Sequence, residues 1–282
     1  MVKKVILFSI ISILIAGCAA LRDFAENQRP TIQYNSMSIQ GFDFSSATLQ
    51  FNFDVDNPNP VGLTANRYTY EFFVNDNSFL SGTQDENLRI SRESVSTLSV
   101  PVTLRFSEMF NTFSTLFRDD SFAYAINTEV QFDIPGLGMQ RLPVNASGTL
   151  PIPKVPRIEF GGFDVKNLSL TGAEMELNLN ITNTNSFPIA LNRANYQLEV
   201  NGRNWLDTSL SEPLRLSESG SSQLTIPISL NASQMGNVLV EMMRGSTNFD
   251  YKLTGSADVG AEIEGFSFTD TIPFDLSGVF RN

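Results

Sequence analysis

The most regular pattern in this chain is an alternation of apolar and polar residues. Between residues 48 and 56 the apolar positions are Leu49, Phe51, Phe53 and Val55, and every other residue is polar. A period of two places one face of a β-strand in a core and the other in water, which favours an antiparallel sheet. Comparable runs predict strands at 68–74, 98–104, 123–132, 142–150, 174–182, 196–200, 224–230, 250–259 and 271–279.

The second half of the chain repeats the first. Residues 30–110 align with residues 156–236 at a constant offset of 126 and without a gap. Matched pairs include Pro30 and Pro156, Asn52 and Asn178, Tyr70 and Tyr196, Leu104 and Leu230, and Met109 and Met235. A unit of about 125 residues is an ordinary domain size, so one module occurs twice.

A helix is predicted after the strand at 98–104 and again after its copy at 224–230. Ser107 is expected to be the N-cap of the first helix and Ser233 that of the second. The apolar residues that follow at helical spacing are expected to face the core: Met109, Phe113, Leu116, Phe117, Met235, Val238, Leu239, Met242 and Met243. Roughly five to seven strands and one short α-helix per unit, without a βαβ rhythm, predict a mainly β protein of two tandem antiparallel β-sandwich domains.

The N-terminus has the composition of a secretory signal peptide. Lys3 and Lys4 precede an apolar run at 5–15, and Ala16, Gly17 and Cys18 follow it. The run is too short for a transmembrane helix, which takes about 20 apolar residues. Residues 1–17 are therefore predicted to be removed by cleavage between Gly17 and Cys18.

The segment Ile15-Ala16-Gly17-Cys18 resembles the lipobox of bacterial lipoproteins. This resemblance implies that the thiol of Cys18 carries lipid, such as palmitate, and anchors the protein to a membrane of the cell envelope. Cys18 is the only cysteine among 282 residues, so it has no partner for an internal disulfide. The alternative is an ordinary signal peptide that contains a cysteine. In a host with two membranes, Ala19 and Ala20, which lack the aspartate associated with inner-membrane retention, favour the outer membrane, facing the periplasm.

Three prolines mark the boundary between the two domains. Pro151, Pro153 and Pro156 lie within seven residues, 150–156, and prolines at this density form a short, stiff connector. The predicted organisation is a tether at 18–29, a first sandwich at 30–150 and a second at 155–282.

An asparagine-rich turn follows the strongest strand of each copy. It reads Asn57-Pro58-Asn59-Pro60 in the first copy, and the second retains Asn183 and Asn185. Asparagine side chains bond to neighbouring backbone groups, and proline fixes φ and ends strand pairing. The motif predicts a structural turn between sheets, and a loop that touches a ligand is the alternative.

The strand at 49–56, this turn, and the segment from Tyr68 to Asn75 resemble the water-stress and hypersensitive-response (WHy) domain of type 2 late embryogenesis abundant proteins. The second copy matches through Asn183, Asn185, Pro188, Tyr196 and the segment 200–202, although prolines are missing at 184 and 186. The resemblance implies an immunoglobulin-like or fibronectin III-like sandwich, a role in stress tolerance, and no catalytic residues.

Composition limits the chemistry that the chain can perform. With 19 basic and 30 acidic residues, the formal net charge is −11, which argues against binding of nucleic acid. The chain has no histidine, so a Ser-His-Asp arrangement is excluded, and no metal site or cofactor is expected. The carboxylate pairs Asp54 with Asp56 and Asp119 with Asp120 are expected to be solvated surface groups rather than catalytic ones.

Three functions remain after these exclusions. The first is a non-catalytic, lipid-anchored envelope protein that protects against stress or binds another envelope protein. The second is a carrier of a lipid or other apolar ligand, suggested by the 23 phenylalanines. The third is a hydrolase that uses carboxylates alone. The sequence names no partner and leaves the oligomeric state open.

Overall fold

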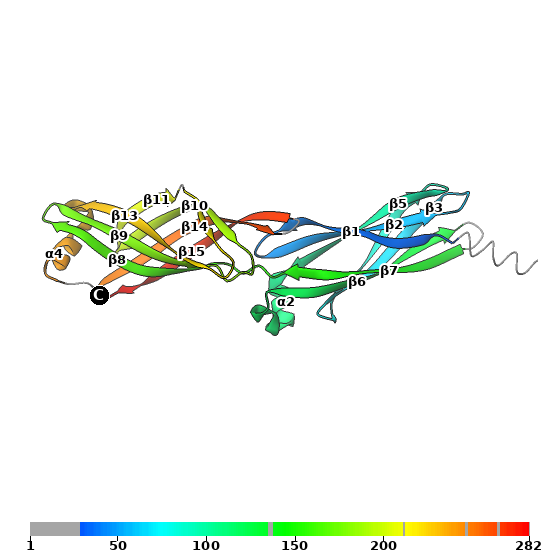
Figure 1. Ribbon diagram of the computed structural model, residues 1–282, viewed down its shortest axis with the longest axis horizontal. Coiled ribbons are helices and arrows are strands. Elements are labelled where there is room, and N and C mark those ends of the chain that lie inside the picture. Colours follow the sequence, from blue (N-terminus) through cyan, green and yellow to red (C-terminus); the bar gives the residue numbers. More distant parts are fainter. Residues whose placement is uncertain (1–28, 135–137, 211, 246–247, 264–265, 282) are drawn as a thin grey trace, which may run out of the picture. The chain divides into compact units, whose positions relative to one another are not determined.

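The computed structural model describes residues 29–134, 138–210, 212–245, 248–263 and 266–281 (Figure 1). Its contacts divide the chain into two compact units. The described part of unit 1 runs through Gln40, then from Ala47 to Phe117 and from Ser121 to Leu150. Unit 2 contains residues 41–46, 118–120 and the chain from Pro151 onward. The signal peptide and most of the tether, including Gly17 and Cys18, lie outside the described residues.

Unit 1 is a sandwich of two antiparallel sheets. The first sheet has the order β1-β2-β5, and the second has the order β4-β3-β6-β7. The bounds are β1 (Thr31–Phe42), β2 (Ser46–Asn57), β3 (Leu63–Val74), β4 (Asn77–Ile90), β5 (Ser94–Arg105), β6 (Ser121–Ile134) and β7 (Gly138–Pro151).

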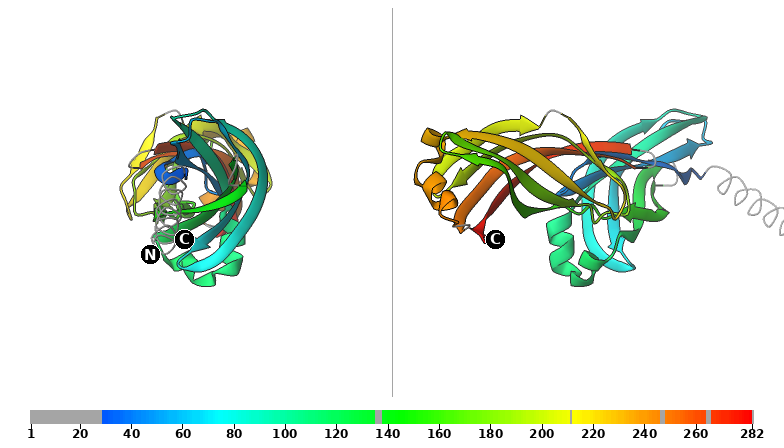
Figure 2. Two further views of the ribbon diagram at one scale, coloured as in Figure 1. Left: turned by 90° about the vertical axis from the view of Figure 1, so that its right-hand side faces the viewer. Right: turned by 60° about the vertical axis from the view of Figure 1, so that its left-hand side comes forward.

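Unit 2 repeats this topology strand for strand (Figures 1 and 2). One sheet has the order β13-β9-β8, and the other has the order β11-β10-β14-β15, with β12 also paired to β10. The bounds are β8 (Arg157–Ser169), β9 (Gly172–Thr182), β10 (Ile189–Val200), β11 (Arg203–Leu210), β12 (Leu214–Leu216), β13 (Ser221–Asn231), β14 (Phe249–Ile263) and β15 (Phe266–Phe280). The predicted mainly β fold with two antiparallel sandwiches is confirmed.

The fourth strand of each unit pairs with the third strand. In an immunoglobulin constant-type domain the fourth strand instead joins the sheet of the first, second and fifth strands, so both units depart from that arrangement. In unit 1 the fourth strand is continuous, whereas in unit 2 it is divided into β11 and β12. Pro213 precedes β12 and has no N–H to donate to a neighbouring strand, and Asn87 stands at the equivalent position of unit 1.

The core follows the alternation seen in the sequence. Leu49, Phe51, Phe53 and Val55 of β2 are all fully buried. Burial of one such side chain stabilises the fold by roughly 1.5–3 kcal/mol. In unit 1 the largest fully buried side chains are mainly aromatic: Tyr68, Phe51, Phe53, Phe72, Phe106, Phe122 and Phe132.

The helical segments lie after the fifth strand of each unit, but their predicted caps are wrong. In unit 1, α2 (Phe106–Thr112) begins before Ser107, its N-cap Arg105 makes no side-chain cap bond, and the 3₁₀ helix η1 (Ser114–Arg118) follows. In unit 2, Asn231 caps α3 (Ala232–Met235). The error has a physical cause: serine favours caps by propensity, but the end of the preceding strand decides where the helix begins.

The second helix is also divided, because Gly236 adopts φ 57° and separates α3 from α4 (Asn237–Met243). Most of the predicted core-facing residues are buried, namely Met109, Leu116, Met235, Val238 and Leu239. Phe113 and Met242 are half-buried, and Met243 is 47% exposed.

Candidate functional site

The side chain of Asn57 organises the signature turn of unit 1. Asn57 is fully buried, and its Nδ2 donates to the carbonyl oxygens of Val61 and Ser91, both at 2.9 Å. Its Oδ1 accepts hydrogen bonds from the backbone N and the Nδ2 of Asn59, at 3.0 and 2.8 Å. The carbonyl of Asn59 then accepts from the backbone N of Glu93 at 3.0 Å. One amide therefore ties together the end of β2, the start of β3 and the β4–β5 connection.

Unit 2 repeats the same network. Asn183 Nδ2 donates to the carbonyl oxygens of Phe187 at 2.8 Å and Ser217 at 2.9 Å. Asn183 Oδ1 accepts from the backbone N and the Nδ2 of Asn185, again at 3.0 and 2.8 Å. The backbone N of Ser219 donates to the carbonyl of Asn185 at 2.9 Å.

Asn185 also holds the connector that leads into unit 2. Its Oδ1 accepts from the backbone N of Lys154 at 2.6 Å, and its Nδ2 donates to the carbonyl of Lys154 at 2.8 Å. Asn183 is fully buried, and Asn185 is 1% exposed. The polar atoms of these side chains therefore bond within the protein itself, which is the arrangement expected of a structural turn.

A second asparagine turn escaped the sequence analysis. Asn75 and Asn201 have φ 46° and 49° and lie in the β3–β4 and β10–β11 hairpins. Their Oδ1 atoms accept from the backbone N of Ala123 and of Asp250, both at 2.9 Å. The dipeptides Asn75-Asp76 and Asn201-Gly202 between alternating runs are the sequence signal for such hairpin turns.

The carboxylates considered for catalysis are used in structural contacts or exposed. Asp54 accepts from Asn35 Nδ2 at 2.6 Å and from Thr97 Oγ1 at 2.8 Å, and Asp56 is exposed. Asp120 pairs with Lys154 Nζ at 2.7 Å. Among the described residues, no cluster of three or more acidic, histidine or cysteine side chains has the geometry to hold a metal ion.

One other carboxylate, Asp43, has a shifted pKa. Burial acts to raise it, but hydrogen bonds from the side chain and backbone of Ser45 and from Ser46 outweigh burial and hold the pKa below its usual value. All of these partners lie within three residues of Asp43, at distances between 2.6 and 3.3 Å. The shift is therefore produced by a local turn and does not indicate a reactive centre.

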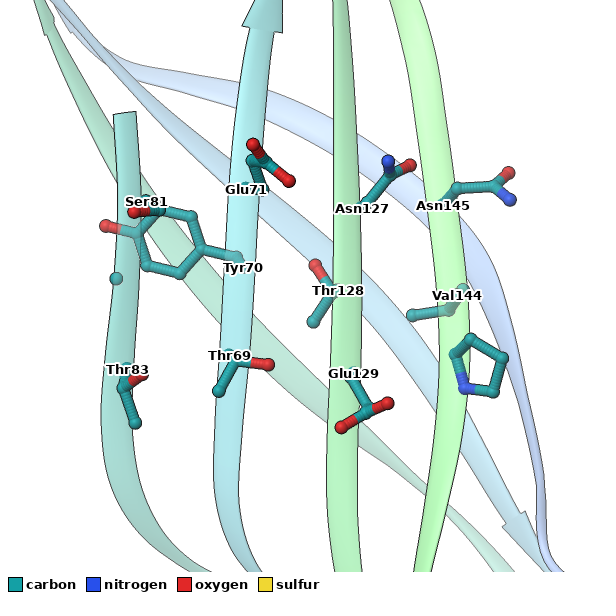
Figure 3. A pocket seen from close by; sticks show the side chains of 12 residues that line it. Thr69, Tyr70, Glu71, Ser81, Thr83, Asn127, Thr128, Glu129, Val144 and Asn145 are labelled. Carbon is teal, nitrogen blue, oxygen red and sulfur yellow. The ribbon is translucent and has the colours of Figure 1, made fainter. Parts of the chain in front are cut away.

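The hollows found in the described part of the chain are shallow surface troughs, not closed cavities between sheets. The largest lies on the β4-β3-β6-β7 sheet and is lined mainly by threonine, asparagine and glutamate side chains (Figure 3). Of the 23 phenylalanines that suggested an apolar ligand, ten are buried in the cores of the two units, and the other described ones are half-buried. Within residues 29–281, as far as they are described, no helix is long and apolar enough to cross a membrane.

The chain matches the family model of late embryogenesis abundant proteins, LEA type 2, over residues 52–148 and 178–278. These two matches cover more than half of the chain, once for each sandwich. The chain belongs to this family. Each match starts within the second strand of its unit and ends in the seventh, so each sandwich is one LEA type 2 domain.

The solved structures to which this LEA type 2 protein is similar share little sequence with it. A solution structure from Arabidopsis thaliana is 16% identical, covers 43% of this chain and 80% of its own, and has a TM-score of 0.37. A solution structure assigned to the late embryogenesis abundant proteins is 19% identical, with 52% and 86% covered and a TM-score of 0.39. A crystal structure from Archaeoglobus fulgidus is 14% identical, with 46% and 98% covered and a TM-score of 0.26. Among curated proteins, no sequence matches this chain significantly.

Proposed function

We propose that this protein is a non-catalytic, lipid-anchored protein of the cell envelope. Its two LEA type 2 domains would protect envelope components during stress by binding to them. In this proposal Cys18 carries the lipid, cleavage occurs after Gly17, and the anchor is in the outer membrane, facing the periplasm.

The observation that carries the proposal is the segment Ile15-Ala16-Gly17-Cys18, which precedes two LEA type 2 domains. A thiol at this position can be acylated, and acyl chains partition into a bilayer with about 0.8 kcal/mol per buried CH₂ group. The short segment at 19–29 then leads from the lipid to the first sandwich.

The absence of catalysis is supported by the way in which polar residues are used. The buried asparagines of the two turns bond to their own backbone, and the chain has no histidine. Family membership points in the same direction, since the resemblance identified in the sequence attaches no catalytic residues to this domain. A family likeness mainly transfers a fold, so the envelope role needs its own test.

Metabolic labelling with palmitate tests the anchor. The wild-type protein is expected to incorporate label and to fractionate with outer membranes. Cys18→Ala and Cys18→Ser should both lose the label and leave the membrane fraction, whereas Ala19→Ser is a neighbouring control that should retain both. An unlabelled wild-type protein, or label that persists in both Cys18 variants, would refute the anchor.

Deletion of the gene tests the stress role. Cells without the protein should survive drying and osmotic shock less well than the parent strain, and a copy with Cys18→Ala should not restore survival. Equal survival of the deletion strain under both stresses would count against protection and leave the anchor unaffected.

A further inference from the structure

On the outer face of the β1-β2-β5 sheet, the central polar side chains form hydrogen bonds with one another. Asp54 accepts from Asn35 and Thr97, at 2.6 and 2.8 Å. Two residues before Asp54 on β2, Asn52 donates to Ser36 Oγ at 3.2 Å and accepts from Ser99 Oγ at 2.8 Å. The polar groups in the middle of this face therefore satisfy one another across the three strands.

The outer face of the other sheet of unit 1 carries a trough of about 910 Å³. Its floor is the backbone of a cross-strand row that contains the register pairs Tyr70 with Gly82 and Tyr70 with Thr128. The side chains on either side of this row form two polar rims (Figure 3). One rim consists of Ser81, Glu71, Asn127 and Asn145, and the other of Thr83, Thr69, Glu129 and Pro143.

The trough differs from the first face because its central polar side chains are not bonded to each other. Among the described residues, Thr69, Thr83, Asn127 and Asn145 make no side-chain hydrogen bond, whereas Glu71 accepts from Ser78 Oγ at 2.6 Å. Each asparagine offers two donors and one acceptor, and each threonine hydroxyl offers both kinds of group. The trough therefore presents many free donors and acceptors within one surface hollow.

The charge of the trough restricts what can occupy it. Glu71 and Glu129 repel polyanions. The two cations beside the trough are already paired, Arg67 with Asp85 at 2.7 Å and Arg141 with Glu129 at 3.5 Å. An apolar ligand would bury these polar groups without partners, at about 1–3 kcal/mol each. An extended peptide would add along a strand edge, whereas the trough runs across the strands from β4 to β7. An uncharged molecule with many hydroxyl groups fits all three constraints.

We propose that this trough binds an uncharged oligosaccharide chain. Its vicinal hydroxyl groups would bridge the two rims, donate to Glu71 and Glu129, and accept from Asn127 and Asn145. The trough crosses all four strands, so a chain of several sugars lies along it rather than a single sugar. The site would give the envelope protein a direct contact with neutral glycan, which goes beyond the proposed anchoring role.

Unit 2 carries a changed version of this surface. Its register pairs Asn195 with Ser256 and Gln197 with Thr254, where unit 1 pairs Thr69 with Glu129 and Glu71 with Asn127. Both carboxylates are therefore replaced in unit 2 by neutral groups. Because charge-assisted hydrogen bonds are the stronger ones, unit 1 is the binding domain of the pair.

Saturation-transfer NMR on the full chain in detergent tests the proposal. The probes are cellotetraose and the tetramer of N-acetylglucosamine, at millimolar concentration, with an acidic oligosaccharide as the charged comparison. At least one neutral probe is expected to receive saturation, and the acidic one is not. If neither neutral probe binds, the proposal is overturned. That result leaves the lipid attachment at Cys18 untouched, because the assay does not involve it.

Variants locate the site. Asn127→Ala and Asn145→Ala should each weaken binding by up to about tenfold, the equivalent of one good hydrogen bond. Thr69→Arg should abolish binding by filling the trough. The control Asn204→Ala removes an exposed strand asparagine of unit 2 and should bind as the wild type does. Unchanged unfolding midpoints show that these surface variants are folded, and full binding by the folded Thr69→Arg protein would refute the trough as the site.

Discussion

The signature turns of the two domains have different sequences and the same hydrogen bonds. Asn57 lies beside Pro58 and Pro60, whereas Asn183 lies beside Thr184 and Ser186. The loss of both prolines left the geometry of the second turn in question at the level of sequence. Corresponding bond lengths nevertheless differ by no more than 0.1 Å between the copies, 2.9 against 2.8 Å for the first donated bond.

This comparison shows which residues define the turn. A proline can only fix φ at its own position, but the asparagine side chain bonds to backbone groups of two connections, the one between β2 and β3 and the one between β4 and β5. The asparagines are therefore necessary in both copies, and the prolines adjust stability. Four experiments separate these contributions, and domain-specific fluorescence makes them measurable.

A single tryptophan makes the two domains separable by fluorescence. Trp205 is the only tryptophan in the chain, it lies in β11, and it is 4% exposed, so its fluorescence follows the unfolding of domain 2. Phe79 occupies the equivalent position of domain 1. The double variant Trp205→Phe with Phe79→Trp transfers the probe to domain 1.

Replacement of the buried turn asparagine is expected to have the largest effect. Asn57→Ala leaves the carbonyls of Val61 and Ser91 and the amide of Asn59 without their partner. Asn59 is 4% exposed, so its unsatisfied amide costs about 1–3 kcal/mol, whereas Val61 and Ser91 are exposed residues and lose only the net value of a hydrogen bond. The expected loss is on the order of 2–3 kcal/mol, measured by urea unfolding of domain 1. Asn183→Ala should cost domain 2 a similar amount.

Asn57→Asp is the matched control for this first experiment. It retains an acceptor for Asn59 but places a buried carboxylate oxygen against the carbonyl oxygens of Val61 and Ser91, so at neutral pH its effect should be at least as large as that of the alanine. A loss below about 1 kcal/mol for either alanine variant would contradict the central role of the amide.

Exchange of the helix caps is expected to have the next largest effect. Asn231 accepts from the backbone N of Gln234 at 3.0 Å, and Gln234 Oε1 accepts in return from the backbone N of Asn231 at 3.0 Å. Asn231→Ala should therefore destabilise domain 2 by about 1 kcal/mol. Domain 1 has no such cap, but Glu108 stands at the position of Gln234, three residues after Arg105.

Arg105→Asn should accordingly create a capping box and raise the stability of domain 1 by about 0.5–1 kcal/mol. The ion pair that this substitution removes is 3.3 Å long between side chains that are 68% and 60% exposed, so it contributes little. Arg105→Ala is the control, because it removes the same ion pair without adding a cap. Equal stability of the asparagine and alanine variants would show that the cap does not form.

The sequence predicted the inner strands well because their signal, the alternation of apolar and polar residues, is a local property of the chain. β2 alternates between a buried and a solvated face along its whole length, and so does β9 for most of its length. β1, β4, β8 and β11 were missed as strands. Each is an edge strand whose burial pattern shows little alternation, and the short β12 was missed as well. β5, β7, β13 and β15 are also edge strands, but their burial alternates, and they were predicted.

The turn was predicted from its residues, but its bonding pattern was not. Ser91 and Ser217, which accept from Asn57 and Asn183, lie 34 residues further along the chain. Such a contact exists only once the sheets have assembled, and residue propensity carries no information about it. The trough on domain 1 was missed for the same reason, since its rims come from four strands.

Exchange of the prolines between the two turns should have a smaller effect. Thr184→Pro and Ser186→Pro should each stabilise domain 2 by about 0.4–1 kcal/mol, because proline reduces the entropy of the unfolded chain where the native φ is compatible. Pro58→Thr and Pro60→Ser should destabilise domain 1 by similar amounts. Unfolding midpoints from the two tryptophan probes measure both changes. A loss of several kcal/mol in the Pro58→Thr protein would show that the proline, and not Asn57, holds the turn.

Alkaline pH should produce the smallest change, and it should affect both domains in the same direction. Burial raises the pKa of Tyr124 in domain 1 and of Tyr196 and Tyr251 in domain 2 above the usual 10.0. For Tyr68, burial is the main cause, and the charge of Glu86 adds to it. The folded state therefore keeps protons that the unfolded state releases, so this contribution is complete below pH 10 and is lost as the pH rises above it.

Thermal unfolding from about pH 8 to pH 11 should accordingly show midpoints that fall above pH 10 for each domain-specific probe. Tyr196→Phe should reduce the pH dependence of domain 2 alone, and Tyr124→Phe that of domain 1 alone, since each removes one titrating hydroxyl. If Tyr196→Phe leaves the pH dependence of the unfolding midpoint of domain 2 unchanged, Tyr196 does not titrate differently in the folded and unfolded states. The alkaline loss of domain 2 would then come from another group, such as Tyr251, whose pKa burial also raises.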